Sequence, residues 1–68
     1  MKRMCAVILE VNPDSLLVRD EATSQEVFVH TRCACRFQTD DRIVILYNGI
    51  MTMSLPPQIT ASKIFRNC

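Results

Sequence analysis

The feature that most constrains the fold of this sequence is a short apolar run that leads through a glycine into an unusually apolar loop. The charged pair Asp41–Arg42 precedes the run Ile43–Tyr47, and Gly49 follows it. Residues 50–55 then place four large apolar side chains in a loop, and two prolines direct the chain to a last strand at 59–65. A strand, a loop and a returning strand in this order are typical of a small β-barrel.

The composition predicts one all-β domain covering residues 1–68. A chain of 68 residues buries only about 60% of the surface that its unfolded form exposes, so we expect a stability of a few kcal/mol. Hydrophobic residues make up 49% of the chain and charged residues 22%, which excludes intrinsic disorder. Val, Ile and Thr each outnumber Ala, and these three residues favour strands.

The charge balance limits the kinds of partner. Eight basic and seven acidic residues leave a formal net charge of +1. A domain that holds nucleic acid mainly by neutralising phosphates has a pI above about 9. The charge therefore argues against tight, non-specific binding of nucleic acid.

The N-terminal segment predicts a cytoplasmic protein with no membrane contact. Its apolar run ends at Glu10 without a small-residue cleavage site, and it is far shorter than the ~20 residues that span a bilayer. We therefore interpret it as the first strand. In a reducing compartment the four cysteines are expected to be free thiols and not disulfides.

Five strands are expected, each separated from the next by a turn or a loop. They are Cys5–Val11, Leu16–Arg19, Glu26–His30, Ile43–Tyr47 and Ile59–Phe65. Alternation predicts that Val27 and Val29 point into the core, and that Leu16 and Val18 do the same. Both faces of the first and fourth strands are apolar, so the pattern leaves their inward faces open.

Residues 31–37 lie where a three-stranded meander must cross the barrel to start a fourth strand. We expect at most one short helical turn there, with Phe37 and either Ala34 or the cysteines closing the bottom of the barrel. Three meander strands, a short crossing element and two more strands form the five-stranded Greek-key barrel called the OB-fold. The sequence therefore predicts an all-β, OB-fold-like Greek-key barrel.

The most distinctive motif is Gly49 followed by Ser54-x-Pro56-x-Gln58-x-x-Ala61. With the rest of the strand pattern it resembles a group of short, uncharacterised bacterial proteins and lipoprotein domains with OB-like barrels. The resemblance covers nearly the whole chain and implies the fold, but it implies no activity. Related barrels usually carry Gly-Asp before the fourth strand, where this sequence has Asp40-Asp41; Asp40 can still adopt a left-handed conformation at modest cost.

The first functional hypothesis is weak binding of single-stranded nucleic acid to the outer face of the second and third strands. OB-folds bind oligonucleotides there, using aromatic side chains for bases and cations for phosphates. The candidate residues are Arg19, Phe28, His30 and Arg32, with Met51 and Met53 beside the groove. Glu21 and Glu26 lie nearby in the sequence, and Phe28 could instead simply cover a neighbouring side chain.

The second hypothesis is a protein-interaction or homodimerisation module that uses the apolar loop 50–55. Its candidate residues are Ile50, Met51, Met53 and Leu55. Exposed apolar side chains of this kind form a patch that soluble monomers seldom carry without a partner, and methionine suits an adaptable interface. The alternative interpretation, which is compatible with an interface at Met51 and Met53, is a loop that caps the barrel end. Alternation would then bury Ile50 and Leu55 and leave Met51 and Met53 outside.

The third hypothesis is a zinc site formed by His30, Cys33 and Cys35, with Cys5 or Cys68 as a fourth ligand. The C-x-C spacing is tighter than the usual C-x2 to C-x4-C spacing, so buried or half-buried thiols beside a surface imidazole are the simpler interpretation. A catalytic cysteine with His30 as its base would also need an oxyanion donor and a cleft. The sequence therefore predicts a binding module without a cofactor, and not an enzyme.

Overall fold

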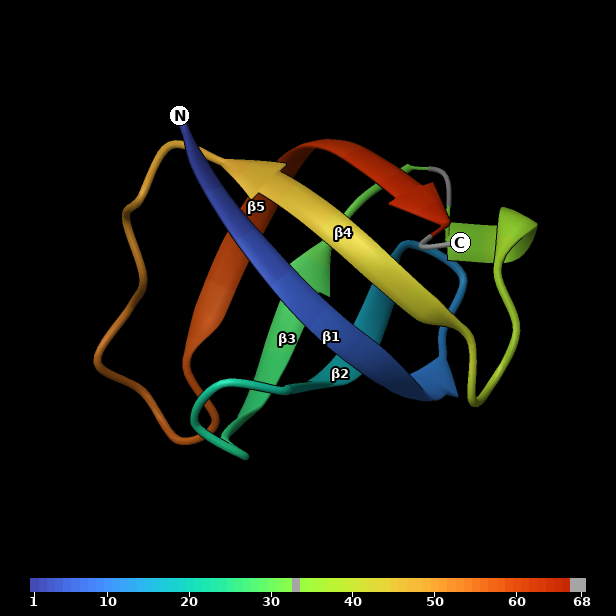
Figure 1. Ribbon diagram of the computed structural model, residues 1–68, viewed down its shortest axis with the longest axis horizontal. Coiled ribbons are helices and arrows are strands. Elements are labelled where there is room, and N and C mark those ends of the chain that lie inside the picture. The colour runs from blue at the N-terminus through green and yellow to red at the C-terminus, as the bar shows by residue number, and fades with distance from the viewer. Residues whose placement is uncertain (33, 67–68) are drawn as a thin grey trace.

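The computed structural model describes residues 1–32 and 34–66 and contains five strands and one short 3-10 helix (Figure 1). In chain order they are β1 (Lys2–Val11), β2 (Ser15–Asp20), β3 (Glu26–His30), the helix η1 (Ala34–Arg36), β4 (Arg42–Tyr47) and β5 (Gln58–Arg66). The predicted all-β chain with one short helical turn between the third and fourth strands is confirmed. Among the described residues, no helix is long and apolar enough to cross a membrane.

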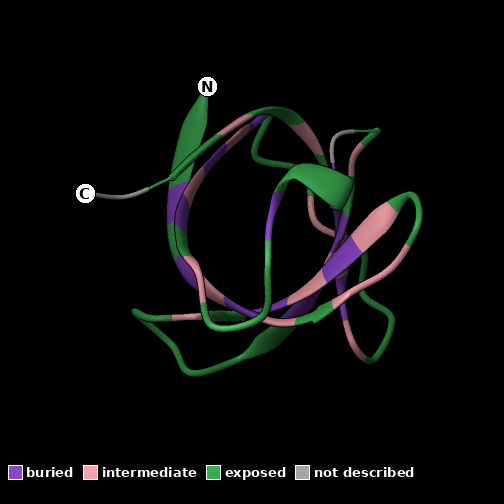
Figure 2. Cartoon of the chain, turned by 90° about the vertical axis from the view of Figure 1, so that its right-hand side faces the viewer, coloured by how far each residue is buried: buried purple, intermediate pink, exposed green. Residues whose placement is uncertain are grey.

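The strands close into a barrel in the order β1-β2-β3-β5-β4. Neighbouring strands are antiparallel except β3 and β5, which run parallel. Because β4 lies beyond β5 and next to β1, the connection from β3 to β4 must cross an end of the barrel. Figure 2 shows the barrel as a ring with this connection across its opening. The structure is the OB-fold-like Greek-key barrel that the sequence predicts.

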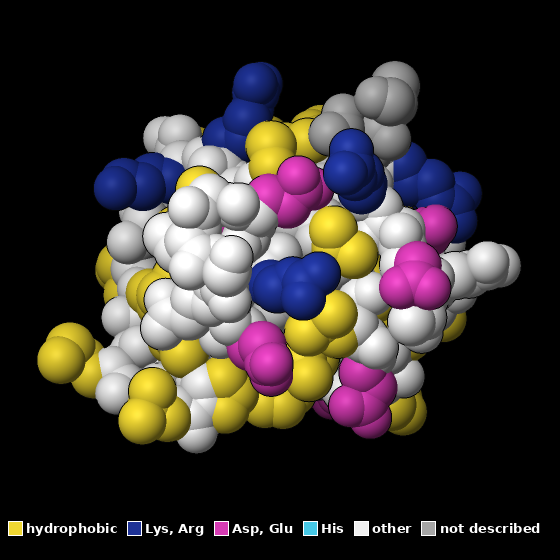
Figure 3. Space-filling model, turned by 60° about the horizontal axis from the view of Figure 1, so that its bottom comes forward, with side chains coloured by type: hydrophobic (Ala, Val, Ile, Leu, Met, Phe, Trp, Pro, Cys, Tyr) yellow, Lys and Arg dark blue, Asp and Glu magenta, His cyan; other side chains and the backbone are white. Residues whose placement is uncertain are grey.

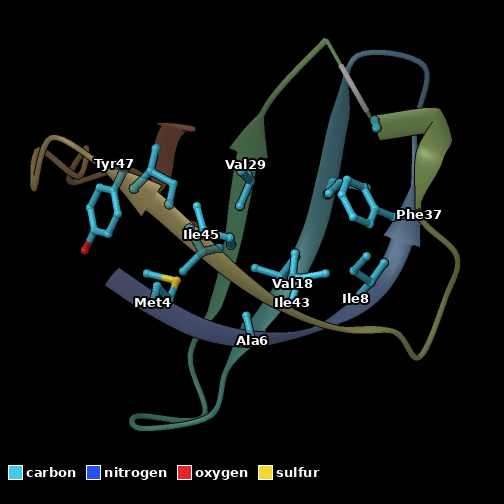
Figure 4. Close-up of a cluster of buried hydrophobic side chains, with 13 residues drawn as sticks. Met4, Ala6, Ile8, Val18, Val29, Phe37, Ile43, Ile45 and Tyr47 are labelled. Atoms are coloured by element: carbon cyan, nitrogen blue, oxygen red, sulfur yellow. The ribbon is translucent and has the colours of Figure 1, made fainter. Parts of the chain in front are cut away.

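Alternation along each strand places one set of side chains inside the barrel. Leu16, Val18, Val27 and Val29 are fully buried, as predicted. The structure also shows which face points inward in β1 and in β4, the two strands that are apolar on both faces. The inward residues of β1 are Met4, Ala6 and Ile8, and those of β4 are Ile43, Ile45 and Tyr47 (Figure 4).

The interior of the barrel is apolar throughout. The core consists of aliphatic side chains with Phe37 and Tyr47, and no polar or charged side chain of the described residues is buried. Side chains fill small barrels of this kind. A ligand must therefore bind on the outside of this barrel, at a strand face, a strand edge or a loop.

Helix η1 and Phe37 close one end of the barrel. Ala34 is fully buried and Phe37 is 9% exposed, and both belong to the core. Figure 4 shows the Phe37 ring at this end of the barrel. The Arg66 guanidinium lies 5.7 Å from the Phe37 ring centroid and donates a 2.7 Å hydrogen bond to the Arg36 carbonyl. The predicted plug of Phe37 with Ala34 is confirmed; Cys35 is exposed, and Cys33 lies outside the described residues.

The turn before β4 takes the left-handed conformation that aspartate can adopt at modest cost. Asp40 has a φ of 74°. Its N–H donates to the Ile8 carbonyl at 2.8 Å, and the Ile8 N–H donates to the Asp41 carbonyl at 2.9 Å. These bonds attach the turn to β1 at the point where the pairing of β1 with β2 shifts register, between Ile8 and Glu10.

Candidate binding groove beside the β4–β5 loop

The β4–β5 loop, residues 48–57, exposes most of its large apolar side chains. Ile50 is 69% exposed, Met53 is 98% exposed and Leu55 is 91% exposed, whereas Met51 packs against the core. In Figure 3, hydrophobic side chains project at the left, on the side where this loop lies in Figure 1. We call Ile50, Met53 and Leu55 the apolar tip.

These exposures correct the capping interpretation of the loop. That interpretation buries Ile50 and Leu55, but both are exposed, and Met51 takes the inward position instead. The reason is that strand alternation does not continue past Gly49, whose φ of 89° turns the chain. The Ile50 N–H then donates to the Asn48 side chain at 2.9 Å, which fixes the start of the loop.

Polar contacts hold the β4–β5 loop in one shape. The Thr52 N–H donates to the Gln58 carbonyl at 3.0 Å, and the Gln58 N–H donates to Thr52 Oγ1 at 2.9 Å. Thr52 Oγ1 also lies 2.8 Å from Ser54 Oγ, which donates to the Pro56 carbonyl at 3.1 Å. The loop therefore presents the apolar tip on a backbone that its own side chains have ordered.

A groove begins beside this loop and continues along β5. Its first part, of about 200 Å³, lies between the loop and the start of β5, and its second part, of about 500 Å³, lies between β5 and the chain that follows β3. His30 and Thr60 line both parts, so the two form one continuous surface. The other lining residues are Asn48, Ile50, Thr52, Gln58 and Ile59 in the first part, and Asp14, Thr31, Arg32, Ala61 and Ser62 in the second.

The groove exists because β3 and β5 separate after a short pairing. They pair only where Phe28–His30 meets Gln58–Thr60. The Thr31 N–H then donates to the Asp14 carbonyl at 3.1 Å, which directs the chain toward the β1–β2 turn and away from β5. Strand β5 continues to Arg66 along β4, so the space beside it widens.

The groove walls carry almost no net charge, and they expose more apolar than polar surface. The charged lining residues are Asp14 and Arg32, one of each sign, and the remaining polar groups are hydroxyls, side-chain amides and His30. His30 Nε2 lies 2.8 Å from Gln58 Oε1, so these two side chains form a hydrogen-bonded pair across β3 and β5. Such walls suit a ligand that hydrogen-bonds through neutral groups.

The structure separates the four residues of the nucleic-acid hypothesis. His30 and Arg32 line the groove. Phe28 is half-buried, with Leu17 opposite it on β2 and Gln58 opposite it on β5.

Arg19 is exposed, and its cross-strand partner is Glu26. A carboxylate directly opposite a cation reduces the charge available to a phosphate. The nucleic-acid hypothesis therefore stays a prediction for the β2–β3 face, and the groove draws on only half of its residues.

The zinc hypothesis rests partly on a residue outside the described range. Within residues 1–32 and 34–66, no group of three His, Cys, Asp or Glu side chains is placed to hold a metal ion. Cys35 is exposed at η1, His30 is paired with Gln58, and Cys33 is not described.

Sequence reasoning missed the contribution of β5 and of the β1–β2 turn to the groove. Ala61 closes the motif that begins at Gly49, but that motif implies no activity; Thr60, Ser62 and Asp14 belong to no motif, and small polar residues are common on strand surfaces. The available signal was topological, because the predicted barrel order makes β3 and β5 parallel neighbours. Comparison with protein-family models, with curated proteins and with solved structures found no match.

Proposed function

We propose that this protein is a protein-interaction module that binds a segment of another protein with the apolar tip and the adjoining groove. The observation that carries this proposal is the exposure of Ile50, Met53 and Leu55, between 69% and 98%, on a loop held by its own hydrogen bonds. Apolar side chains gathered at an exposed site are typical of an interaction surface. Because the loop is already ordered, little conformational entropy is lost when a partner binds.

The size of the apolar tip implies a partner that also covers the groove. Burying one large apolar side chain contributes about 1.5–3 kcal/mol, and each Å² of buried apolar surface contributes about 25 cal/mol. Burying the three side chains of the apolar tip therefore removes on the order of 300 Å² from water. A standard interface buries about 800 Å² on each partner. Ile50 belongs to both the tip and the groove, so the two surfaces are continuous and together supply the larger area.

The groove favours a different chain over a second copy of this one. Across residues 1–32 and 34–66, every stretch long enough to fill the groove in an extended form already pairs within the barrel. The β4–β5 loop is folded on itself through Thr52 and Ser54. A nearly neutral groove also suits a polypeptide better than a polyanion.

The test uses a phage-displayed library of random 12-residue peptides, selected against the full chain. Peptides that bind the wild-type protein are expected to lose at least tenfold in affinity when Met53→Ser and Leu55→Ser are combined. Phe65→Ser is the matched control, because Phe65 is 47% exposed on β5 and lines neither part of the groove. Fluorescence anisotropy measures the affinities, and thermal unfolding checks that each variant is folded.

Two results would contradict the proposal. One is a set of selected peptides that bind the double variant as tightly as the wild type. The other is sedimentation velocity showing a wild-type dimer that the double variant abolishes, which would make a second copy of the chain the partner.

A further inference from the structure

Among the described residues, strand β5 has an edge along the groove with which no other strand pairs. On one side it pairs with β4 from Ala61 to Arg66, and on the other side it pairs with β3 only from Gln58 to Thr60. No strand of the described residues pairs with β5 beyond Thr60 on the β3 side. An exposed strand edge presents backbone N–H and C=O groups that can pair with another chain.

We infer that the groove accepts an extended segment of the partner, which pairs with β5 beyond Thr60, along Ala61 and Ser62, and takes the place that β3 leaves. The inference rests on the proposed function and adds to it the conformation of the bound segment. Backbone pairing at a sheet edge supplies affinity in this mode of recognition, and alternate side chains supply specificity.

The two walls of the groove are spaced by the fold itself. The chain at Thr31 and Arg32 is drawn toward the β1–β2 turn by the hydrogen bond to the Asp14 carbonyl, while β5 continues along β4. The space between them, about 500 Å³, lies beside Thr60, Ala61 and Ser62. These three side chains are small, so a peptide backbone can approach the edge closely.

The lining residues define the chemistry of the segment. One carboxylate and one guanidinium, from Asp14 and Arg32, stand at the end of the groove near the β1–β2 turn, and Ile50 stands at the loop end. We expect a segment of nearly zero net charge with an apolar residue at the loop end, where it reaches the tip. A sugar–phosphate chain lacks the alternating N–H and C=O groups that a strand edge pairs with.

The decisive measurement is an N-methyl scan of the tightest-binding peptide from the random library. Methylation removes one backbone N–H at a time, and in a paired strand only alternate N–H groups face the neighbouring strand. We expect a loss of at least tenfold at every second position and less than twofold at the positions between. A scan without this period of two, by fluorescence anisotropy, would overturn strand pairing.

Filling the groove from the protein side locates the bound strand. Thr60→Trp adds an indole at an exposed position that lines both parts of the groove, and we expect it to reduce peptide affinity at least tenfold. Thr39→Trp is the matched control, because Thr39 is also exposed and lines neither part. An unchanged affinity in Thr60→Trp would place the peptide elsewhere and overturn the inference.

The outcomes separate this inference from the proposed function. If affinity depends on Met53 and Leu55 but shows neither the N-methyl period nor the Thr60→Trp effect, the interaction module stands and strand pairing is wrong. If the period and the Thr60→Trp effect appear without any dependence on the apolar tip, strand pairing stands and the role of the tip is wrong. A library that yields no binder contradicts both.

Discussion

At the scale of single residues, Asp40 shows that the backbone conformation of a residue can matter more than the chemistry of its side chain. Asp40 has a φ of 74°, and its N–H and the neighbouring Asp41 carbonyl both bond to the backbone of Ile8. The contacts that attach this turn to β1 are therefore backbone contacts. The position requires a left-handed conformation, which costs most L-residues roughly 1–2 kcal/mol and aspartate less.

The first prediction is that Asp40→Gly stabilises the protein. Glycine adopts positive φ without a steric cost, so we expect the free energy of unfolding to rise by about 0.5–1 kcal/mol. Urea denaturation followed by circular dichroism measures the change. Thr39→Gly is the control, since Thr39 has no positive φ, and it should lower stability by about 0.4–1 kcal/mol because glycine loses more entropy on folding. A destabilised Asp40→Gly protein would mean that the carboxylate itself holds the turn.

Alternation predicted inward residues only where the two faces of a strand differ. In β3 the valines at 27 and 29 alternate with Glu26 and His30, and the valines are buried. In β4 the outward residues Val44 and Leu46 are as apolar as the inward ones. Both are half-buried on the outer face, and Phe65 lies opposite Val44 on β5. Only the pairing with other strands reveals which face is inside.

At the scale of elements, the β4–β5 loop shows why the spacing of its apolar residues could not predict that Met51 is the one that packs against the core. A period of two applies to an extended strand, but this loop is shaped by Gly49 and by the hydrogen bonds of Thr52. Thr52 Oγ1 accepts from the Gln58 N–H and contacts Ser54 Oγ, so one hydroxyl joins the middle of the loop to its end. The threonine gave no signal in the sequence, since its role depends on residues that folding brings close.

The second prediction concerns that hydroxyl. Thr52→Val keeps the shape of the side chain but removes the acceptor for the Gln58 N–H, so we expect a loss of stability of about 1 kcal/mol. We also expect faster amide hydrogen exchange across residues 50–58, because the loop loses one of the two hydrogen bonds between Thr52 and Gln58 that join its two sides. Hydrogen–deuterium exchange read by NMR measures both the site and the size of the effect.

A matched control for Thr52→Val lies in the β2–β3 turn. Thr23 Oγ1 accepts a 3.3 Å hydrogen bond from the Gln25 N–H, so Thr23→Val also removes one local acceptor. It should leave exchange in the β4–β5 loop unchanged. Equal amide exchange in the two variants would show that the Thr52 hydroxyl does not order the loop. The claim that the apolar tip is preorganised would then be wrong.

At the scale of the whole molecule, the barrel order brings together residues that are distant in the sequence. Asp14, Arg32 and Ser62 come from the β1–β2 turn, the chain after β3 and β5, and they line one groove. The five strands and their order followed from local patterns and turn residues. The groove forms where β3 and β5 separate. No single segment of the sequence predicts this separation, because it arises from the hydrogen bond between Thr31 and Asp14.

The distribution of charge is also a property of the whole surface. Lys and Arg side chains are interspersed with Asp and Glu on the face in Figure 3. Arg42 lies 3.8 Å from Glu21, and Arg66 lies 3.4 Å from Asp41, so two of the cations have acidic neighbours. Exposed pairs of this kind add little stability, but they reduce the positive potential that would attract a polyanion.

The third prediction follows from this charge and tests the nucleic-acid hypothesis on the β2–β3 face. With Arg19 and Arg32 as its cations, that face makes at most two phosphate contacts. For single strands each contact contributes about −0.7 to the slope of log K against log salt, so the slope should be about −1.4 or shallower. Fluorescence anisotropy with a labelled dT20 oligonucleotide between 25 and 200 mM salt measures it.

The aromatic residue of that face supplies the second readout. If bases stack on Phe28, Phe28→Ala should cost about 1–3 kcal/mol of binding, which is a loss of roughly 5- to 150-fold. Phe65→Ala is the control, because Phe65 lies on β5 and pairs with Val44 away from this face. A slope near −4 with a strong effect of Phe28→Ala would identify a nucleic-acid interface of many phosphate contacts. Such a slope needs more cations than the β2–β3 face provides, so the nucleic acid would have to extend over the groove as well, and the polypeptide partner proposed for the groove would then be wrong.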